Sequence, residues 1–192
     1  MAWVKAEYAG ELAVVAAWVA ALTPWSLTLQ PKGPLGSILF MVRWPVGELQ
    51  VRLASTVTID GAEVAVSAVL AEAYPGVRVL GPVFVADPLS ATAFYGVPVL
   101  AYGGWGWVLG GLAVLVAVGL SVALYRDESG TTDRLPVDPV RGMAALLAVA
   151  TVGFAAATVG VWFGPPRVGV PIPVGVVVVG ALSGVLARVE RV

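Results

Sequence analysis

The amino-acid sequence predicts a mainly helical membrane protein: a four-transmembrane-helix bundle with a small mixed α+β extracytoplasmic domain inserted between helices 1 and 2. Hydrophobic residues make up 59% of the chain and charged residues only 12%, roughly half the charged share of a soluble domain. Residues 105–125 contain no charge and no proline, and as a helix they would span about 30 Å, the thickness of the bilayer hydrocarbon core. This stretch is therefore predicted to be transmembrane helix 2.

The composition also excludes several kinds of site. The sequence has no cysteine and no histidine, which excludes disulfides and any metal or haem site built on thiolate or imidazole ligands. The net charge of −1 gives no basis for binding nucleic acid. No cofactor, metal site or catalytic residue is predicted, and catalysis would have to rest on carboxylates, hydroxyls, lysine or arginine.

Residues 1–29 are predicted to hold transmembrane helix 1. A cleaved signal peptide is the alternative, because the apolar core at residues 12–22 is short, but the acidic residues Glu7 and Glu11 near its start argue against cleavage. The two carboxylates share a helix face at the membrane edge, where the first helical turns favour negative charge. A proton or cation site is the alternative interpretation of this pair.

Residues 30–104 contain no run long enough to span a bilayer and are too long for an idle loop. They are predicted to form the extracytoplasmic α+β domain, with strands at 37–44, 48–59 and 77–85 and a short helix at 88–95. The charged side chains of this domain are expected to lie dispersed on a solvated surface; they are Arg43, Glu48, Arg52, Asp60, Glu63, Glu72, Arg78 and Asp87.

Asp60 and Gly61 have two interpretations. They could form a two-residue turn between two strands. Alternatively, Asp60 begins a helix over residues 62–74, with Glu63 completing a capping box. The alanine-rich composition of that segment slightly favours the helix, and its β-branched valines keep the hairpin open.

A polar connector at residues 126–138 leads to transmembrane helices 3 and 4 within residues 139–192. The short termini and the connector carry six basic residues, whereas the turn between the last two helices carries only Arg167. The protein is predicted to lie in the cell membrane, and the positive-inside rule places both termini in the cytoplasm. The interface aromatics expected at the outer side are Trp25, Trp105, Trp107 and Trp162.

Glycines at a spacing of four let helix backbones approach closely, either within one bundle or between subunits. Three such pairs are predicted to pack helices: Gly106 and Gly110, Gly160 and Gly164, and Gly180 and Gly184.

The function favoured by these features is that of a non-enzymatic structural or accessory subunit. Its partners would be the lipid bilayer and either another membrane protein or a second copy of itself. A small oligomeric channel or transporter is the alternative, although no predicted span carries an ionisable group near its centre, as pumps usually do. A lipid-directed enzyme using carboxylates such as Asp60 and Glu63 is a further hypothesis.

Four short stretches, at residues 7–12, 24–26, 138–141 and 171–175, together resemble an uncharacterised family of haloarchaeal four-helix integral membrane proteins. They lie towards both ends of the chain and in the connector. The resemblance implies a membrane topology, and it implies no activity and no catalytic residue.

Overall fold

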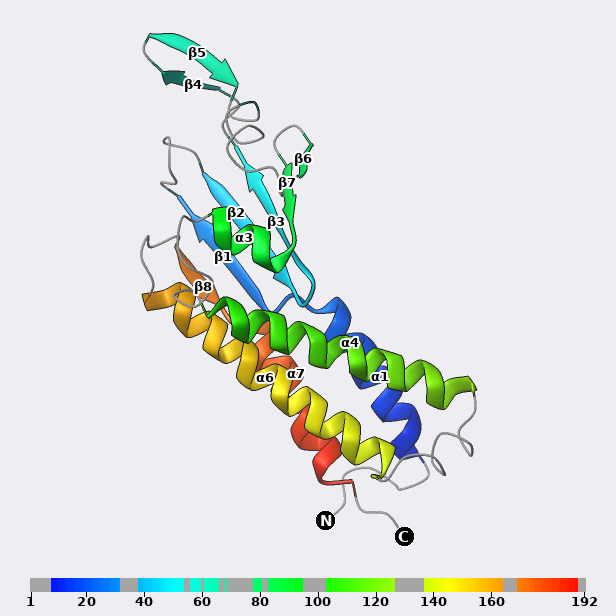
Figure 1. Ribbon diagram of the computed structural model, residues 1–192. Coiled ribbons are helices and arrows are strands. Elements are labelled where there is room, and N and C mark those ends of the chain that lie inside the picture. The colour runs from blue at the N-terminus through cyan, green and yellow to red at the C-terminus, as the bar shows by residue number, and fades with distance from the viewer. Residues whose placement is uncertain are drawn as a thin grey trace.

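The computed structural model describes residues 8–31, 38–53, 56–59, 61–65, 68, 78–80, 83–94, 103–126, 137–163 and 169–189. Within these residues the chain forms five helices and eight strands (Figure 1). The helices are α1 (Ala9–Leu22), α3 (Pro88–Phe94), α4 (Gly104–Arg126), α6 (Pro139–Phe163) and α7 (Val174–Ala187). The strands are β1 (Ser26–Gln30), β2 (Leu39–Trp44), β3 (Gly47–Arg52), β4 (Thr56–Ile59), β5 (Ala62–Ala65), β6 (Arg78–Leu80), β7 (Val83–Ala86) and β8 (Val170–Ile172).

Six strands form one antiparallel sheet in the order β6-β7-β3-β2-β1-β8, and β4 and β5 form a separate hairpin. The sheet stands at one end of the helices, and the hairpin lies farthest from them (Figure 1). Because β1 follows α1 and β8 precedes α7, the sheet continues the layer of α1 and α7. Helix α3 lies over one face of the sheet, on the side of α4 and α6 (Figure 1).

The predicted four-transmembrane-helix bundle is wrong. Among the described residues, only α4 and α6, with 23 and 25 residues, are long and apolar enough to cross a membrane. Helices α1 and α7 have 14 residues each and would extend only about 21 Å. The rest of the first and fourth predicted spans is extended chain, which pairs in the sheet as β1 and β8.

Prolines explain where α1 ends and α7 begins, because the residue before a proline is driven out of the helical conformation. Thr23, which precedes Pro24, is already extended with ψ 125°. Pro171 lies within β8, and Pro173 comes directly before α7. The residues next to these prolines therefore leave the helix and enter the sheet.

The helix favoured from residue 62 onward is wrong at its start, because β5 occupies this position and pairs with β4. Gly61 has a φ of +81°, the conformation that a tight hairpin turn requires and that glycine adopts without strain. The sheet also includes strands from outside the predicted domain at 30–104, since β8 and all of β1 except Gln30 lie outside that range. Most of the predicted connector, residues 127–136, lies outside the described residues.

Glycines bring α4 close to two neighbours. A Cβ on Gly106 would lie 2.6 Å from the carbonyl oxygen of Gly153 in α6, and one on Gly110 would lie 2.8 Å from the ring of Phe154. A Cβ on Gly111 would overlap the carbonyl oxygen of Pro45, in the turn between β2 and β3. The sheet is therefore seated directly on α4.

Asp87 caps α3. Its Oδ1 accepts hydrogen bonds from the backbone N–H groups of Leu89 and Ser90, at 2.9 and 3.1 Å, and its Oδ2 accepts one from the Ser90 hydroxyl at 2.6 Å. Burial by itself raises the pKa of Asp87, but the hydrogen bonds from Ser90 and Leu89 outweigh it and lower the pKa below its ordinary 3.8. The charged form is therefore favoured by folding.

Asp87→Ala should destabilise the protein by about 1 kcal/mol near neutral pH, the usual cost of losing an N-cap. Because the folded pKa is lowered, this contribution is present above the unfolded pKa and is lost as the pH falls through the folded value. The gap in the free energy of unfolding between wild type and variant should therefore narrow as the pH falls below about 5 and on through the ordinary pKa of 3.8. A gap that stays constant would contradict this cap, and Glu63→Ala, at an exposed carboxylate on β5, is the control.

Gly111→Ala should destabilise the protein by about 1–3 kcal/mol, because the added methyl group must displace the β2–β3 turn. Gly119→Ala in the same helix is the matched control, since a Cβ there meets nothing within 4 Å. The control should be neutral or stabilising by up to about 1 kcal/mol, owing to the better helix propensity of alanine. Thermal unfolding followed by circular dichroism measures both, and equal stability of the two variants would argue against this seating.

Candidate functional site

Polar side chains are buried on the face of the sheet that α3 covers. The strand register places Arg43 opposite Glu48, and it places Met41 between Gln50 and Thr28. We call these five residues the inner-face cluster, and none is more than 4% exposed. Because successive side chains of a strand point to opposite faces, alternate residues of β1, β2 and β3 contribute to this one cluster.

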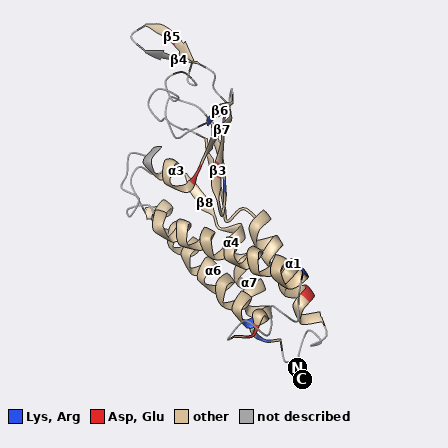
Figure 2. Ribbon diagram, turned by 45° about the vertical axis from the view of Figure 1, so that its right-hand side comes forward, with Lys and Arg blue, Asp and Glu red and all other residues tan. Residues whose placement is uncertain are grey.

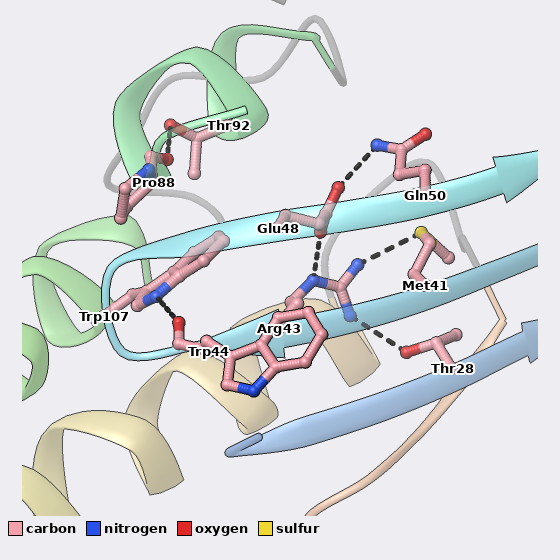
Figure 3. A network of polar contacts seen from close by, with 9 residues as sticks. All are labelled: Thr28, Met41, Arg43, Trp44, Glu48, Gln50, Pro88, Thr92 and Trp107. Atoms are coloured by element: carbon pink, nitrogen blue, oxygen red, sulfur yellow. Dashed lines mark hydrogen bonds and ion pairs between the residues drawn. The ribbon is translucent and has the colours of Figure 1, made fainter. Parts of the chain in front are cut away.

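Arg43 is the centre of the inner-face cluster (Figure 3). Its Nε donates to Glu48 Oε2 at 2.5 Å, its Nη1 to Thr28 Oγ1 at 2.9 Å and its Nη2 to Met41 Sδ at 3.3 Å. The other carboxylate oxygen of Glu48 accepts a hydrogen bond from Gln50 Nε2 at 2.5 Å. The guanidinium also lies over the ring of Trp25, 5.9 Å from its centroid, within cation–π range.

These contacts hold the strands β1, β2 and β3 together. Taking an arginine and a glutamate out of water is costly, and the cost is offset only when the two are paired and their remaining polar atoms are hydrogen-bonded. Here the pair joins β2 to β3, and the bond to Thr28 adds β1. The cluster therefore fixes the register of three adjacent strands.

Aromatic rings join the sheet to the helices below the cluster. Trp25 is 1% exposed; it stacks on Phe154 of α6 with ring centroids 5.8 Å apart and meets Trp107 of α4 edge-on at 5.3 Å. The indole N–H of Trp107 donates to the carbonyl of Trp44 at 2.9 Å, and that of Trp44 donates to the carbonyl of Leu22 at 3.1 Å. The end of the sheet and the helices are thus one packed unit.

The opposite face of the sheet is apolar except for Arg78 at its edge, and it is partly exposed: several of its side chains are exposed, whereas Val42 near its middle is only 8% exposed. We call it the outer face. Its first row, in sheet order, is Arg78, Val85, Leu49, Val42, Leu27 and Ile172, and its second is Leu80, Val83, Val51, Phe40, Leu29 and Val170. Ile38 and Leu53 begin a third row. Leu29 is 55% exposed, Phe40 40% and Leu80 67%, and α3 lies on the other side of the sheet (Figure 2).

The tryptophans predicted to form a membrane belt separate into two groups. Trp105 and Trp162, near the sheet end of α4 and α6, are 50% and 49% exposed. Trp25 and Trp107 are buried at the junction between sheet and helices. Of the predicted membrane-edge carboxylates, Glu11 is exposed on α1, and Glu7 lies outside the described residues.

The predicted helix-packing glycines also differ in their surroundings. Gly106 and Gly110 lie in the contact between α4 and α6. A Cβ on Gly180 would meet the side chain of Thr151 at 3.1 Å, whereas one on Gly184 would meet nothing within 4 Å. Gly160 is partly buried on α6, and Gly164 lies outside the described residues.

Of the two carboxylates suggested for an enzyme, only one lies within the described residues. Glu63 is exposed on β5, and Asp60 lies outside the described residues. Within the part of the chain that the structure describes, no group of three or more Asp or Glu side chains is placed to hold a metal ion.

The expectation that the charges of residues 30–104 lie on a solvated surface holds for Glu63, Arg78 and Asp87, which are exposed, and is wrong for three other residues. Arg43, Glu48 and Arg52 are all buried. A signal for this is present in the sequence, since polar residues alternate with apolar ones at residues 26–30 and again at 48–52. That alternation gives each strand one polar face, but it does not say which face the helices cover.

Comparison with known proteins gives a family. A model of a family of unknown function, DUF7549, matches residues 2–191. The chain belongs to this family. No curated protein and no solved structure matches the chain. The resemblance is thereby confirmed in its coarser form, as membership of an uncharacterised family.

Arg43→Met or Glu48→Leu alone should destabilise the protein by about 3–5 kcal/mol, because each leaves an uncompensated buried charge. The double variant should be more stable than either single variant, since it removes both charges together. Free energies of unfolding of the four proteins measure this coupling. Losses that simply add would contradict it, and Glu63→Leu, at an exposed carboxylate, is the control for removing a charge.

Proposed function

We propose that this protein is a non-enzymatic membrane accessory protein. Helices α4 and α6 cross the lipid bilayer, and the sheet that they carry binds another protein through its outer face. The observation on which the proposal chiefly rests is that apolar surface is exposed both around the long helices and over the outer face of the sheet.

The surface of the long helices supports membrane insertion. Only 44% of the apolar stretch of α4 and 39% of that of α6 is buried, which supports helices that face lipid over helices enclosed in a soluble core. A helix at the surface of a soluble protein carries polar residues on its exposed face. The exposed residues along the middle of α4 and α6 are instead apolar, and the large ones are Leu109, Leu112, Leu115, Val116, Val149, Val152 and Val159.

The ends of these helices suggest an orientation. Trp105 and Trp162 are half-exposed at the sheet end, as aromatic rings are at a membrane interface. Arg126, Arg141 and Arg188 lie at or near the opposite ends of α4, α6 and α7, where a cytoplasmic interface favours basic residues. We therefore place both termini in the cytoplasm and the sheet outside. A haloarchaeal membrane family, which the sequence resembles, is compatible with this arrangement.

The outer face supports protein binding. Exposed apolar patches larger than a few hundred Å² are rare on soluble surfaces and mark interaction sites. The outer face extends over all six strands, so a partner that covers it would remove this surface from water. The inner-face cluster is buried on the other side of the sheet, and its side chains hold strands together. This arrangement favours a binding function over catalysis.

The hydroxyls within the helices do not favour a channel. Ser121, Thr151 and Thr158 each donate to a carbonyl one turn earlier in their own helix. Ser183 of α7 donates to the carbonyl of Ala144 in α6 at 2.9 Å. These hydroxyls are therefore engaged in helix packing.

The membrane part of the proposal predicts the side on which single cysteines can be labelled, because the natural chain has no other thiol. Ala62→Cys on the β4–β5 hairpin should react with a membrane-impermeant maleimide in intact cells. Tyr125→Cys, at the other end of α4, should react only after the cells are opened, although Tyr125 is 86% exposed. Recovery of the full chain in the soluble fraction without detergent would remove the proposal, and the reverse labelling pattern would invert the orientation.

A further inference from the structure

The outer face is a broad apolar surface formed by six strands. Resting on the proposed function, we infer that the protein bound there is a second copy of this chain, packed face to face as a two-fold symmetric dimer. The partner is thereby specified, whereas the proposed function requires only that some protein covers the outer face.

The size of the outer face is near the lower limit for a specific interface. Its six strands contain 27 residues, and at a rise of about 3.4 Å per residue and a strand spacing of about 4.8 Å they cover about 440 Å². Two copies would then bury about 900 Å², close to the area of about 1,000 Å² that a biological interface should clear. Two antiparallel sheets commonly pack in this way, about 10 Å apart with interdigitated apolar side chains.

The chemistry of the outer face favours a copy of itself over a different protein. Partner choice between unlike proteins usually relies on charged and polar groups that match across the interface. In the two complete rows the only charged residue is Arg78, at the β6 edge. The remaining side chains are valines, leucines, one isoleucine and one phenylalanine, and such a surface is complementary to an identical one.

Membrane insertion determines the direction of the two-fold axis. Both copies must place α4 and α6 in the same bilayer and in the same orientation, so the axis is perpendicular to the membrane. Because the strands rise from one end of the helices (Figure 1), this axis runs approximately along the strands. It passes between β2 and β3, the central strands of the sheet. Phe40 then faces the partner copy near the axis, and the β6 edge lies over the β8 edge of the partner copy. This arrangement leaves Arg78 at the solvated rim of the interface.

Crosslinking of single-cysteine variants in native membranes tests this geometry, because each variant of the full chain carries one thiol. Phe40→Cys should crosslink to itself with a short thiol-to-thiol reagent and give a band of twice the chain mass. Leu80→Cys and Val170→Cys lie at opposite edges, and each would be about 24 Å from its own counterpart along the sheet. Neither should crosslink alone, and co-expression of the two should restore the doubled band.

Leu89→Cys is the matched control, because Leu89 is 49% exposed on α3, on the other side of the sheet. It should react freely with a maleimide and form no doubled band. A second variant, Phe40→Lys, brings two like charges together near the axis and should convert the detergent-extracted dimer to a monomer. Leu89→Lys should leave the dimer intact, and unchanged circular dichroism of both variants shows that they are folded.

The outcomes separate this inference from the proposed function. If thiols on the outer face are protected in membranes but crosslink only to a different protein, the dimer is excluded and the proposed function stands. If they are protected and crosslink to no protein, lipid covers the face, and both are overturned. If they react as freely as Leu89→Cys, nothing covers the face, and both again fail. A doubled band from Leu80→Cys alone would overturn the two-fold geometry.

Discussion

The ion pair between Arg43 and Glu48 determines which face of the sheet lies inside. A sheet with one polar and one apolar face normally buries the apolar one. Here the buried guanidinium and carboxylate neutralise each other, and Thr28, Met41 and Gln50 bind their remaining atoms. The polar face can therefore lie beneath α3, and the apolar rows from Ile172 to Val85 are directed outward.

This inversion links the sheet to the helices. The rings of Trp25, Trp107 and Phe154 close the space between the inner-face cluster and α4 and α6. Gly111 lets the turn at Pro45 rest on α4 without a side chain between them. Both the helices and the outer face consequently present apolar residues to their surroundings. These exposed apolar residues are the reason that the two proposed partners are the bilayer, around the helices, and a second apolar sheet, on the outer face.

The long helices are the part of the fold that the sequence predicts most directly. The uncharged stretch at residues 105–125 is found as α4 (Gly104–Arg126), because an apolar run bounded by turn residues specifies a helix locally. The strand β1 was missed although residues 26–30 alternate between polar and apolar side chains. An apolar run immediately before them made one continuous span the simpler interpretation, and β8 was absorbed into the fourth span in the same way. The inner-face cluster was missed because Thr28 lies 15 residues from Arg43, and only strand pairing brings them together.

The sequence by itself determined how apolar the chain is, where its long apolar helices lie and which chemistries its residues cannot supply. These properties follow from composition and from periodicity over a few turns. Only the tertiary structure decided that α1 and α7 stop short and continue as strands, and that arginine and glutamate lie inside while valine and leucine lie outside. The physical reason is that burial of a charge is favourable only with a partner, and the partners here come from strands that meet through folding.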